Sequence, residues 1–507
     1  MKKFLSVSLF LFLHLSLLHL PVLGQVDYEK LNTYLAKAVA DYNVPGLAIA
    51  VVKDGEMVFS HGYGLREAGT DKVITPNSIF GIASCSKAFT ATCIGMLVDE
   101  GKLKWDDRVI DYLPDFQLYD SYITRELRVR DLLCHRTGFD TFDGDLLWYG
   151  SSYDRKEIVR RIRYLPIKNS FRSQFGYSNV MFITAGEVIE AVSGMTWDEF
   201  VQKRIFEPLE MKDARTTNQD FKKKAERALP HLEGKVVGDI NYDNSGPAAS
   251  INASVTDLSK WLTFWLAGGK YGDKQLLSSE SWQEILSAQT AQNPSNLEKQ
   301  MGIHFESYAL GWRLFDYGGR KVVEHDGGLP GYISKVAFIP EENLGVVILT
   351  NGMPVVLNMA IRNEVFDLFL NRPENDWAGR MLKIEKNYLN YVAGQKTERE
   401  KTQILNTQPS LAMADYSGRY EDKMYGPAEI TIRDGKLFLT LLPTATLFTG
   451  ELKHWHYNTF RVDIADPFLP FGLIVFEMDS QGKVTGFTID LPNPDFNFYN
   501  LKFEKAE

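Results

Sequence analysis

The sequence predicts an α/β (α+β) fold: an antiparallel sheet flanked by helices, a helical lobe, and a separate small all-β, barrel-like domain. Strand-like segments lie near both ends of residues 25–372 and enclose a mainly helical middle. From residue 411 onward, short alternating stretches with tight turns take over, which is typical of a small barrel or sandwich. The chain has 507 residues, 44% of them hydrophobic, and is long enough for two or three domains with sizeable cores.

Residues 1–24 have the composition of a secretory signal. A basic pair at positions 2–3 precedes the apolar stretch 4–20, and we expect a cut near Gly24/Gln25. An uncleaved anchor is the alternative, but the apolar stretch is shorter than the ~20 residues that span a bilayer. The protein is therefore predicted to be secreted or periplasmic, without a stable membrane anchor.

The first domain is expected to begin and end with strands. A hairpin is predicted around Asp54-Gly55, because this dipeptide favours a tight turn between two strands. Further strands are expected over 322–325, 332–339 and 344–350, and helices over 25–42, 80–98, 180–192, 197–206, 256–267 and 355–370. One antiparallel sheet should combine the strands from both ends. A charged, partly helical linker, 373–410, then leads to the β domain, 411–507.

The helix predicted over 80–98 carries Ser84 and Lys87, and a spacing of three places them on one face. No charged residue follows Lys87 before Asp99, so the helix is apolar all round and should be buried. Burial disfavours a charged lysine and lowers its pKa. An amine that loses its proton easily beside a serine hydroxyl makes that serine a candidate nucleophile. The alternative is an N-capping serine followed by a surface lysine.

The chain has three cysteines, Cys85, Cys93 and Cys134, an odd and low number for a disulfide scaffold. On one helix, Cys85 and Cys93 would lie about 12 Å apart along the axis, too far for a disulfide. We expect three buried free thiols. Cys85 is an alternative nucleophile to Ser84, but no Cys/His motif supports it and the helix points it away from Lys87.

Two further motifs follow in an order that matches one mechanistic set. In that set S-x-x-K is combined with S-D-N and K-T-G. Here Tyr177-Ser178-Asn179 lies between two helical stretches, and His325-Asp326-Gly327 closes a strand further on. Each motif alone is weak, since residues 480–483 also fit S-x-x-K. Order, spacing and context together predict a three-sided catalytic site.

With these motifs, residues 25–372 resemble the β-lactamase-related serine hydrolases, which include class C β-lactamases, D-Ala-D-Ala carboxypeptidases, D-aminopeptidases and esterases. The resemblance extends to the stretches 132–138, 208–211, 308–312 and 327–332. Residues 411–505 resemble the lipocalin-like β domain found behind some members. The family implies a β-lactamase/transpeptidase-like fold and catalysis by acyl transfer.

The resemblance implies that Ser84 attacks an acyl carbon and forms an acyl-enzyme. Lys87 and Tyr177 would share the proton transfers, with a Lys87 ammonium lowering the pKa of Tyr177 so that it can act as a base. The alternative role for Tyr177 is that of an aromatic anchor at a helix start.

The remaining site residues would hold the substrate. Asn179 would hydrogen-bond the lysine or the substrate amide. His325 would line the opposite wall and transfer a proton, unless it is only a strand histidine with satisfied hydrogen bonds. Backbone N–H groups of Ser84 and Gly328 would form an oxyanion hole. Gly327 and Gly328 would let the substrate backbone approach the strand closely.

The third motif departs from K-T-G, and the departure bears on the substrate. Lysine and threonine would attract the carboxylate of β-lactams and D-Ala-D-Ala peptides, whereas an inward-facing Asp326 would repel it, although strand alternation could turn Asp326 away. We therefore predict a hydrolase of an ester, an amide or a D-amino-acid-containing peptide. A true β-lactamase or D-Ala-D-Ala carboxypeptidase is one alternative, with Arg136 or Arg313 as carboxylate receptor. A non-catalytic ligand-binding protein on the same scaffold is another.

Composition argues against other classes of function. The net charge of −9 disfavours nucleic acid or an anionic membrane as a partner. No glycine-rich phosphate loop and no complete set of metal ligands occurs in the sequence. The expected partner is a small-molecule or peptide substrate, with cell-wall fragments among the candidates, and no cofactor or metal is expected.

Overall fold

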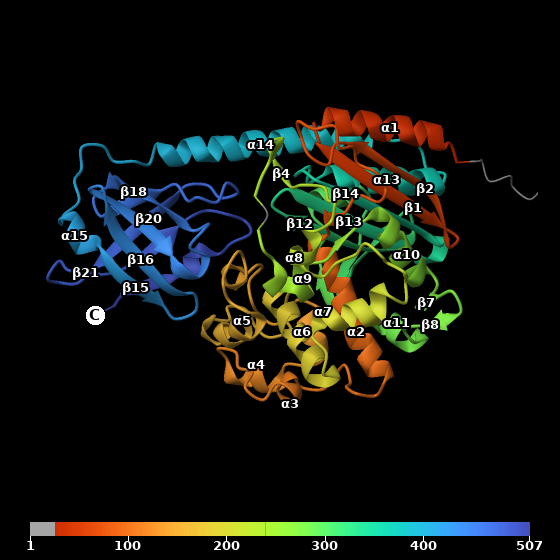
Figure 1. Ribbon diagram of the computed structural model, residues 1–507, viewed down its shortest axis with the longest axis horizontal. Helices are drawn as coiled ribbons and strands as arrows, with labels where there is room; N and C mark the ends of the chain where they lie inside the picture. Colours follow the sequence, from red (N-terminus) through yellow and green to blue (C-terminus); the bar gives the residue numbers. More distant parts are fainter. Residues whose placement is uncertain (1–25, 239, 507) are drawn as a thin grey trace, which may run out of the picture.

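The computed structural model describes residues 26–238 and 240–506. The signal segment predicted over residues 1–24 and its cut near Gly24/Gln25 lie outside the described residues. Two domains follow one another along the chain, an α/β domain and a β-barrel, with one long helix between them (Figure 1). This arrangement confirms the fold class predicted from the sequence.

One antiparallel sheet forms the centre of the first domain. Its strands, in spatial order, are β2 (Glu56–Gly64), β1 (Gly46–Lys53), β14 (Leu344–Thr350), β13 (Tyr332–Ile339), β12 (Arg320–Leu329), β11 (Arg313–Tyr317), β10 (Glu306–Tyr308) and β9 (Thr290–Gln292). The hairpin β1–β2 turns at Asp54-Gly55, as predicted. Strand β1 pairs with β14, with Ile49 opposite Ile348, so both ends of the domain meet in one sheet.

Helices cover both faces of this sheet. On one face lie α1 (Tyr28–Asp41), α13 (Leu357–Phe369) and the first turns of α14 (Trp377–Glu400); on the other lie α2 (Ser86–Asp99) and α10 (Val255–Leu266). Alternate side chains of β1 join the two cores: those of Leu47, Ile49 and Val51 pack in one, and those of Ala48, Ala50 and Val52 in the other. This two-sided burial explains why β1 is apolar throughout.

The helical lobe and its connections supply the remaining elements of the first domain. The further helices are α3 (Val109–Tyr112), α4 (Ser121–Glu126), α5 (Arg155–Arg161), α6 (Asn179–Ser193), α7 (Trp197–Val201), α8 (Asn218–Phe221), α9 (Gly246–Ala249), α11 (Ser279–Ile285) and α12 (Asn296–Gln300). Short strands pair as β3 (Phe80–Gly81) with β6 (Asn252–Ala253), β4 (His231–Leu232) with β5 (Lys235–Val236), and β7 (Lys270–Tyr271) with β8 (Lys274–Gln275).

Helix α2 begins later than the sequence suggests. The pattern predicts a helix over 80–98, but Phe80 and Gly81 form strand β3, and Ser84 lies in a 3₁₀ turn, Ala83–Cys85, that precedes α2. Pairing of β3 with β6 competes with helix formation for these backbone groups. The prediction of a buried helix is confirmed, because α2 from Ser86 to Leu97 is buried on every side.

The second domain is a closed barrel of eight antiparallel strands. They are β15 (Gly418–Asp422), β16 (Gly426–Arg433), β17 (Lys436–Leu441), β18 (Thr449–His456), β19 (Thr459–Val462), β20 (Gly472–Met478), β21 (Val484–Asp490) and β22 (Lys502–Lys505), preceded by α15 (Met413–Tyr416). Pairing of β15 with β22 closes the barrel, which removes its free edges. Rings of Tyr416, Tyr420, Phe476 and Phe487 pack in its interior.

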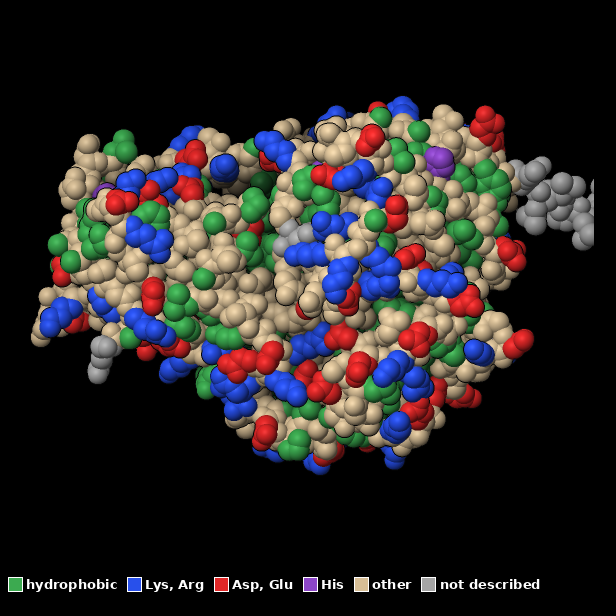
Figure 2. Space-filling model, in the orientation of Figure 1, with side chains coloured by type: hydrophobic (Ala, Val, Ile, Leu, Met, Phe, Trp, Pro, Cys, Tyr) green, Lys and Arg blue, Asp and Glu red, His purple; other side chains and the backbone are tan. Residues whose placement is uncertain are grey.

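The barrel packs against the helical lobe, in addition to its covalent connection through the linker. Helix α14 spans the distance between the domains along the top of Figure 1. At the interface, Tyr149 and Phe496 pack with ring centroids 4.4 Å apart. The side-chain amides of Asn497 and Asn500 each donate to the Asp143 carboxylate at 2.7 Å. On the face shown in Figure 2, positive and negative side chains are interspersed over both domains.

The three cysteines are buried free thiols, as predicted. Among residues 26–238 and 240–506, no helix combines the length and apolarity that a bilayer crossing requires. The same part of the chain holds no cluster of three or more potential metal ligands.

Candidate active site

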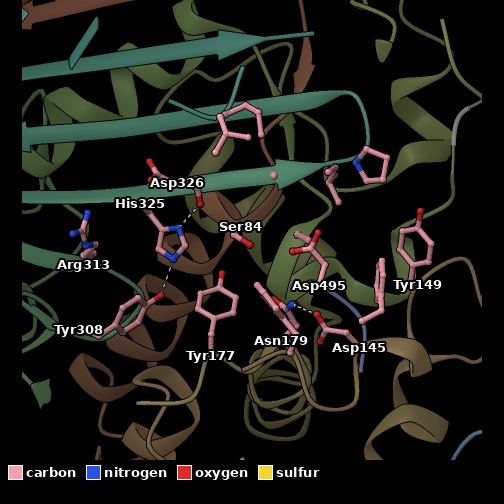
Figure 3. A pocket seen from close by; sticks show the side chains of 18 of the residues that line it. Ser84, Asp145, Tyr149, Tyr177, Asn179, Tyr308, Arg313, His325, Asp326 and Asp495 are labelled. Atoms are coloured by element: carbon pink, nitrogen blue, oxygen red, sulfur yellow. Dashed lines mark hydrogen bonds between the residues drawn. The ribbon is translucent and has the colours of Figure 1, made fainter. Parts of the chain in front are cut away.

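A pocket of about 560 Å³ opens beside the 3₁₀ turn that carries Ser84 (Figure 3). Its walls come from the 3₁₀ turn, the helical lobe, strands β10–β12 and the barrel. The residues that line it include Ser84, Asp145, Trp148, Tyr149, Tyr177, Asn179, Tyr308, Arg313, His325, Asp326, Gly328, Phe468, Asp495 and Phe496.

Ser84 and Lys87 are in hydrogen-bond contact. The Lys87 Nζ donates to Ser84 Oγ at 3.0 Å, to Asn179 Oδ1 at 2.6 Å and to the backbone oxygen of Ala248 at 3.0 Å. The lysine side chain is fully buried, because α2, α6 and α9 enclose it. Three fixed acceptors hold the amine beside the hydroxyl, which is the contact expected for an activated nucleophile.

Burial lowers the pKa of Lys87 to about 7, although the nearby Asp145 carboxyl raises it. A free lysine stays charged well beyond this pH. Neutral amine is therefore abundant near neutral pH, and it can accept the Ser84 proton. This fall in the pKa of Lys87 is the direction expected from the apolar surroundings of the helix.

Tyr177 lies over the same lysine, with Lys87 Nζ 4.7 Å from its ring centroid. Burial raises the pKa of Tyr177, and a hydrogen bond with Ser84 only partly opposes this. The direction is opposite to the one expected from a neighbouring ammonium, because desolvation outweighs the attraction of a lysine that is itself easily neutralised. Tyr177 is thus a protonated phenol beside Ser84, suited to donating a hydrogen bond.

His325 is held in one tautomer. Its Nδ1 lies 2.6 Å from the backbone oxygen of Asp326, which only accepts, so Nδ1 carries the proton. Its Nε2 then accepts from the Tyr308 hydroxyl at 2.7 Å. Burial, with a smaller contribution from Lys87, lowers the pKa of His325 to about 3. The free lone pair of neutral His325 is therefore occupied by Tyr308, and no motif in the sequence singled out Tyr308 for that contact.

The backbone around Ser84 is strained and closely approached. Ala83 has a φ of +48°, a conformation that costs a non-glycine residue about 1–3 kcal/mol and recurs at functional sites. A Cβ on Gly327 would lie 2.2 Å from the backbone oxygen of Ile82, so only glycine lets β12 pack against this turn. Gly328 lines the pocket, and the Ser84 N–H lies in a first turn that offers it no helical acceptor.

Asn179 links Lys87 to a buried carboxylate that the sequence analysis missed. The Asn179 Nδ2 donates to Asp145 Oδ2 at 2.6 Å, while its Oδ1 accepts from Lys87. The two contacts fix the orientation of the amide. Burial raises the pKa of Asp145 to about 7. An isolated aspartate between two helical stretches carries no motif, so its role becomes visible only in three dimensions.

The barrel also contributes to the pocket. Phe468, Asp495 and Phe496 line it together with Ser84 and Asp145, and Figure 3 shows Asp495 and Asp145 on the same side of Ser84. The sequence left the role of the β domain open, because docking of two domains leaves no local pattern in either one. In the structure, the pocket is incomplete without the barrel.

The predicted residues converge on one site. The pocket is lined by Ser84, Tyr177, Asn179, His325 and Gly328. Lys87 donates a hydrogen bond to Ser84 without lining the pocket itself, and Gly327 packs against the turn that carries Ser84. Arg313 also reaches the pocket but forms ion pairs with Glu298, Glu306 and Glu324. Arg136 contacts Asp131 and the backbone of Gln289 instead.

Comparisons with known proteins give two family matches. The profile of the family described as "Beta-lactamase" matches residues 31–365, and that of a "Domain of unknown function (DUF3471)" matches residues 402–505. The first match covers most of the α/β domain and the second covers the barrel.

Several named proteins are similar to this chain. "Unguisins hydrolase ungD'" of Aspergillus campestris is 31% identical over 328 residues, which are 61% of this chain and 59% of that protein. The match therefore spans less than two thirds of that relative. "Penicillin-binding protein 4" of Amycolatopsis lactamdurans is 26% identical over 62% of this chain and 82% of its own length. The structure titled "octameric penicillin-binding protein homologue from Pyrococcus abyssi" superposes with a TM-score of 0.60 at 22% identity, over 94% of this chain and all of that one.

Proposed function

Because the chain belongs to the Beta-lactamase family, we propose that it is a serine hydrolase that cleaves an ester or amide through an acyl-enzyme on Ser84. The observation that carries the proposal is the contact between Ser84 Oγ and the buried Lys87 amine, 3.0 Å apart in the wall of the pocket. The hydrolase and the penicillin-binding protein among the relatives agree with this class of reaction.

In the proposed reaction, neutral Lys87 takes the proton of Ser84 while Oγ attacks the acyl carbon of the substrate. The backbone N–H groups of Ser84 and Gly328 then donate to the oxyanion of the tetrahedral intermediate. Lysine returns the proton to the leaving oxygen or nitrogen, with Tyr177 donating a hydrogen bond beside it. Water repeats the sequence on the ester of Ser84, so that acid is released and the serine is restored.

The charge of the pocket guides the choice of substrate class. Asp145 and Asp495 line it. The Asp326 carboxylate is paired with Lys335, and the one lining arginine, Arg313, is already paired with three glutamates. Such a pocket disfavours a substrate carboxylate. We therefore infer that esters, amides and peptides, D-amino-acid-containing ones among them, are better substrates than β-lactams or peptides ending in D-Ala-D-Ala.

The test is hydrolysis of p-nitrophenyl butyrate by the whole protein and by Ser84→Ala. A matched control is Ser480→Ala, since Ser480 belongs to a second S-x-x-K sequence at an exposed position of the barrel. We expect Ser84→Ala to lose the activity and Ser480→Ala to retain it. Intact-mass measurement during turnover should show one added butyryl group on the wild type alone. Equal rates for Ser84→Ala and wild type would refute the proposal.

A chromogenic cephalosporin should be cleaved poorly, and efficient cleavage would contradict the inferred substrate class.

A further inference from the structure

The stretch 132–138 contains a buried histidine, His135, that the proposed reaction does not use. It follows the 3₁₀ turn Val129–Leu133 and is fully enclosed by the protein. Its backbone φ is +57°, a left-handed conformation that residues other than glycine seldom adopt. Such strain persists only where the surrounding contacts hold the residue in place, and it recurs at functional sites. The contacts of His135 therefore indicate what the strained position provides.

Two hydrogen bonds to His135 hold the chain on either side of Tyr177. The N–H of Gly176 donates to the backbone oxygen of His135 at 2.9 Å, and the N–H of Ser178 donates to its Nδ1 at 3.0 Å. Ser178 is the middle residue of Tyr177-Ser178-Asn179 and directly precedes α6. Because one residue fixes the backbone before and after Tyr177, the direction of the Tyr177 side chain depends on His135.

The imidazole of His135 also packs against two tyrosines that line the pocket. Its ring centroid lies 4.2 Å from that of Tyr177, at an interplanar angle of 33°, and 4.5 Å from that of Tyr308. Tyr177 points toward Ser84 in Figure 3, and Tyr308 donates to His325. Ring contacts at these distances favour a fixed relative orientation. One buried ring thus contacts both aromatic side chains that approach Ser84 and His325.

His135 is not itself suited to proton transfer. Because its Nδ1 accepts from a backbone N–H, its proton is on Nε2, and that N–H has no hydrogen-bond partner among the residues that the structure describes. Burial lowers the pKa of His135 well below its usual range, with smaller contributions from Lys87 and His325. The ring is therefore neutral. An apolar ring would avoid the cost of an unpaired N–H, but it would offer Ser178 no acceptor.

We propose that His135 is a positioning residue that holds the Tyr177 hydroxyl against Ser84, through its Nδ1 acceptor for the Ser178 N–H and through its ring stacked on Tyr177. It does not line the pocket, so it acts on the reaction only through Tyr177. The inference rests on the proposed hydrolase function, because it concerns the geometry of that same site. It also gives the stretch 132–138 a part that the three motifs leave unexplained.

Two substitutions separate the acceptor from the ring. His135→Phe keeps an aromatic ring but leaves the Ser178 N–H without its acceptor, whereas His135→Asn keeps an acceptor oxygen but loses the ring. We expect kcat for p-nitrophenyl butyrate to fall about tenfold or more in His135→Phe and about threefold in His135→Asn, with KM nearly unchanged in both. Each kcat is divided by the number of sites that a serine-reactive fluorophosphonate labels. A merely structural residue would lower the number of intact sites but not the rate of each one.

A double-mutant cycle with Tyr177→Phe tests whether His135 acts through the phenol. His135→Phe should lower kcat per site about tenfold in the wild type but less than about twofold in Tyr177→Phe, since the hydroxyl to be positioned is then absent. His135→Asn completes the same cycle if His135→Phe does not fold. Wild-type kcat per site in both variants of His135, or the same loss with and without the Tyr177 hydroxyl, would overturn the proposal.

The matched control is His61→Phe. His61 also packs on a tyrosine, with its ring centroid 4.6 Å from that of Tyr63, but neither ring lines the pocket. We expect His61→Phe to keep the wild-type kcat per site. A loss as large as that of His135→Phe would mean that any histidine–tyrosine contact has this effect, and the specific role of His135 would be rejected.

Failure of the hydrolase proposal would be recognised separately, by hydrolysis that does not depend on Ser84. Crystal structures of the wild type, His135→Phe and His61→Phe would then measure the position of the Tyr177 hydroxyl directly. A hydroxyl displaced from Ser84 in His135→Phe alone would support the positioning role without the enzyme function. An unmoved hydroxyl would reject the role on its own.

Discussion

Charged side chains are ion-paired at one end of the pocket and unpaired at the other. At the end formed by β10–β12, Arg313 and Lys335 share the buried Glu324, and Lys335 also contacts Asp326. At the other end, Asp145 and Asp495 face the cavity without an ion pair to any described residue. A fully paired wall fixes the geometry of a site, whereas an unpaired one keeps the capacity to bind a ligand of opposite charge.

The ends also differ in origin. Consecutive strands of one sheet build the paired end, so its geometry follows from the register β11–β12–β13. The unpaired end needs the barrel to dock on the helical lobe, through contacts such as Asn497 with Asp143. The sheet therefore fixes the geometry of the paired end. The unpaired end depends on the domain interface, which can differ between proteins that share the three motifs.

Lys87 lies between the two ends, and its removal should have the largest effect on rate. Lys87→Met takes away the proposed base for the Ser84 proton, so we expect kcat/KM for p-nitrophenyl butyrate to fall by roughly 10² to 10⁴. The exposed Lys203→Met, whose side chain is 55% exposed on the surface, is the control. If Lys87→Met retained wild-type kcat/KM, the base would have to be sought elsewhere.

Removing a charge from the buried ion pairs at the paired end should mainly lower the stability of the protein. Arg362, Lys335 and Arg313 hold the pKa of Glu324 well below its usual range in spite of its burial. Glu324→Gln leaves these three cations without their shared carboxylate, which should lower the free energy of unfolding by about 3–5 kcal/mol. Urea denaturation measures this loss.

The matched control for Glu324 is Glu342→Gln, which breaks the exposed pair with Arg320 and should cost no more than about 1 kcal/mol. Equal losses for the two variants would show that the buried cluster does not stabilise the paired end more than a surface pair does.

Much of the candidate site around Ser84 could be predicted from the sequence, because its contacts depend on local spacing. Ser84 and Lys87 meet through one turn of backbone, and Tyr177 and Asn179 flank the start of α6. The order of the three motifs was enough to predict that His325 lines the same pocket. The start of α2 was predicted six residues too early, because pairing of β3 with β6 depends on residue 253, far along the chain.

What the sequence could not provide depends on distant packing. Asp145 begins a short 3₁₀ turn and Asp495 lies in a loop, neither within a periodic pattern, and they line one pocket only when the barrel docks. The pKa of Tyr177 was expected to fall and instead rises, because burial of the phenol is the dominant cause. The extent of that burial depends on packing by distant segments, so the residues next to Tyr177 in the sequence do not reveal it. Closure of the eight strands likewise rests on pairing between the first and the last of them.

Tyr308→Phe removes one hydrogen bond from the paired end and should have a moderate effect. It leaves His325 Nε2 without its donor, so kcat should fall about tenfold or more, with KM less affected, because the loss acts on the position and protonation of the imidazole. Tyr317→Phe loses a comparable bond to Asp367 on the other face of the sheet and should leave kcat unchanged. Similar kinetics for both variants would mean that the Tyr308 contact is only structural.

The smallest effect, and the sharpest test of the unpaired end, is a shift in pH dependence. Burial lowers the pKa of Lys87 to about 7, and the Asp145 carboxylate opposes part of this fall. The active form has neutral Lys87, so kcat/KM rises with pH through that pKa. Asp145→Asn keeps an acceptor for Asn179 but removes the charge, so the rising limb should move to lower pH. A kcat/KM profile between pH 5 and pH 9 measures this. A shift to higher pH, or none, would mean that Asp145 does not act on the lysine through the unpaired end.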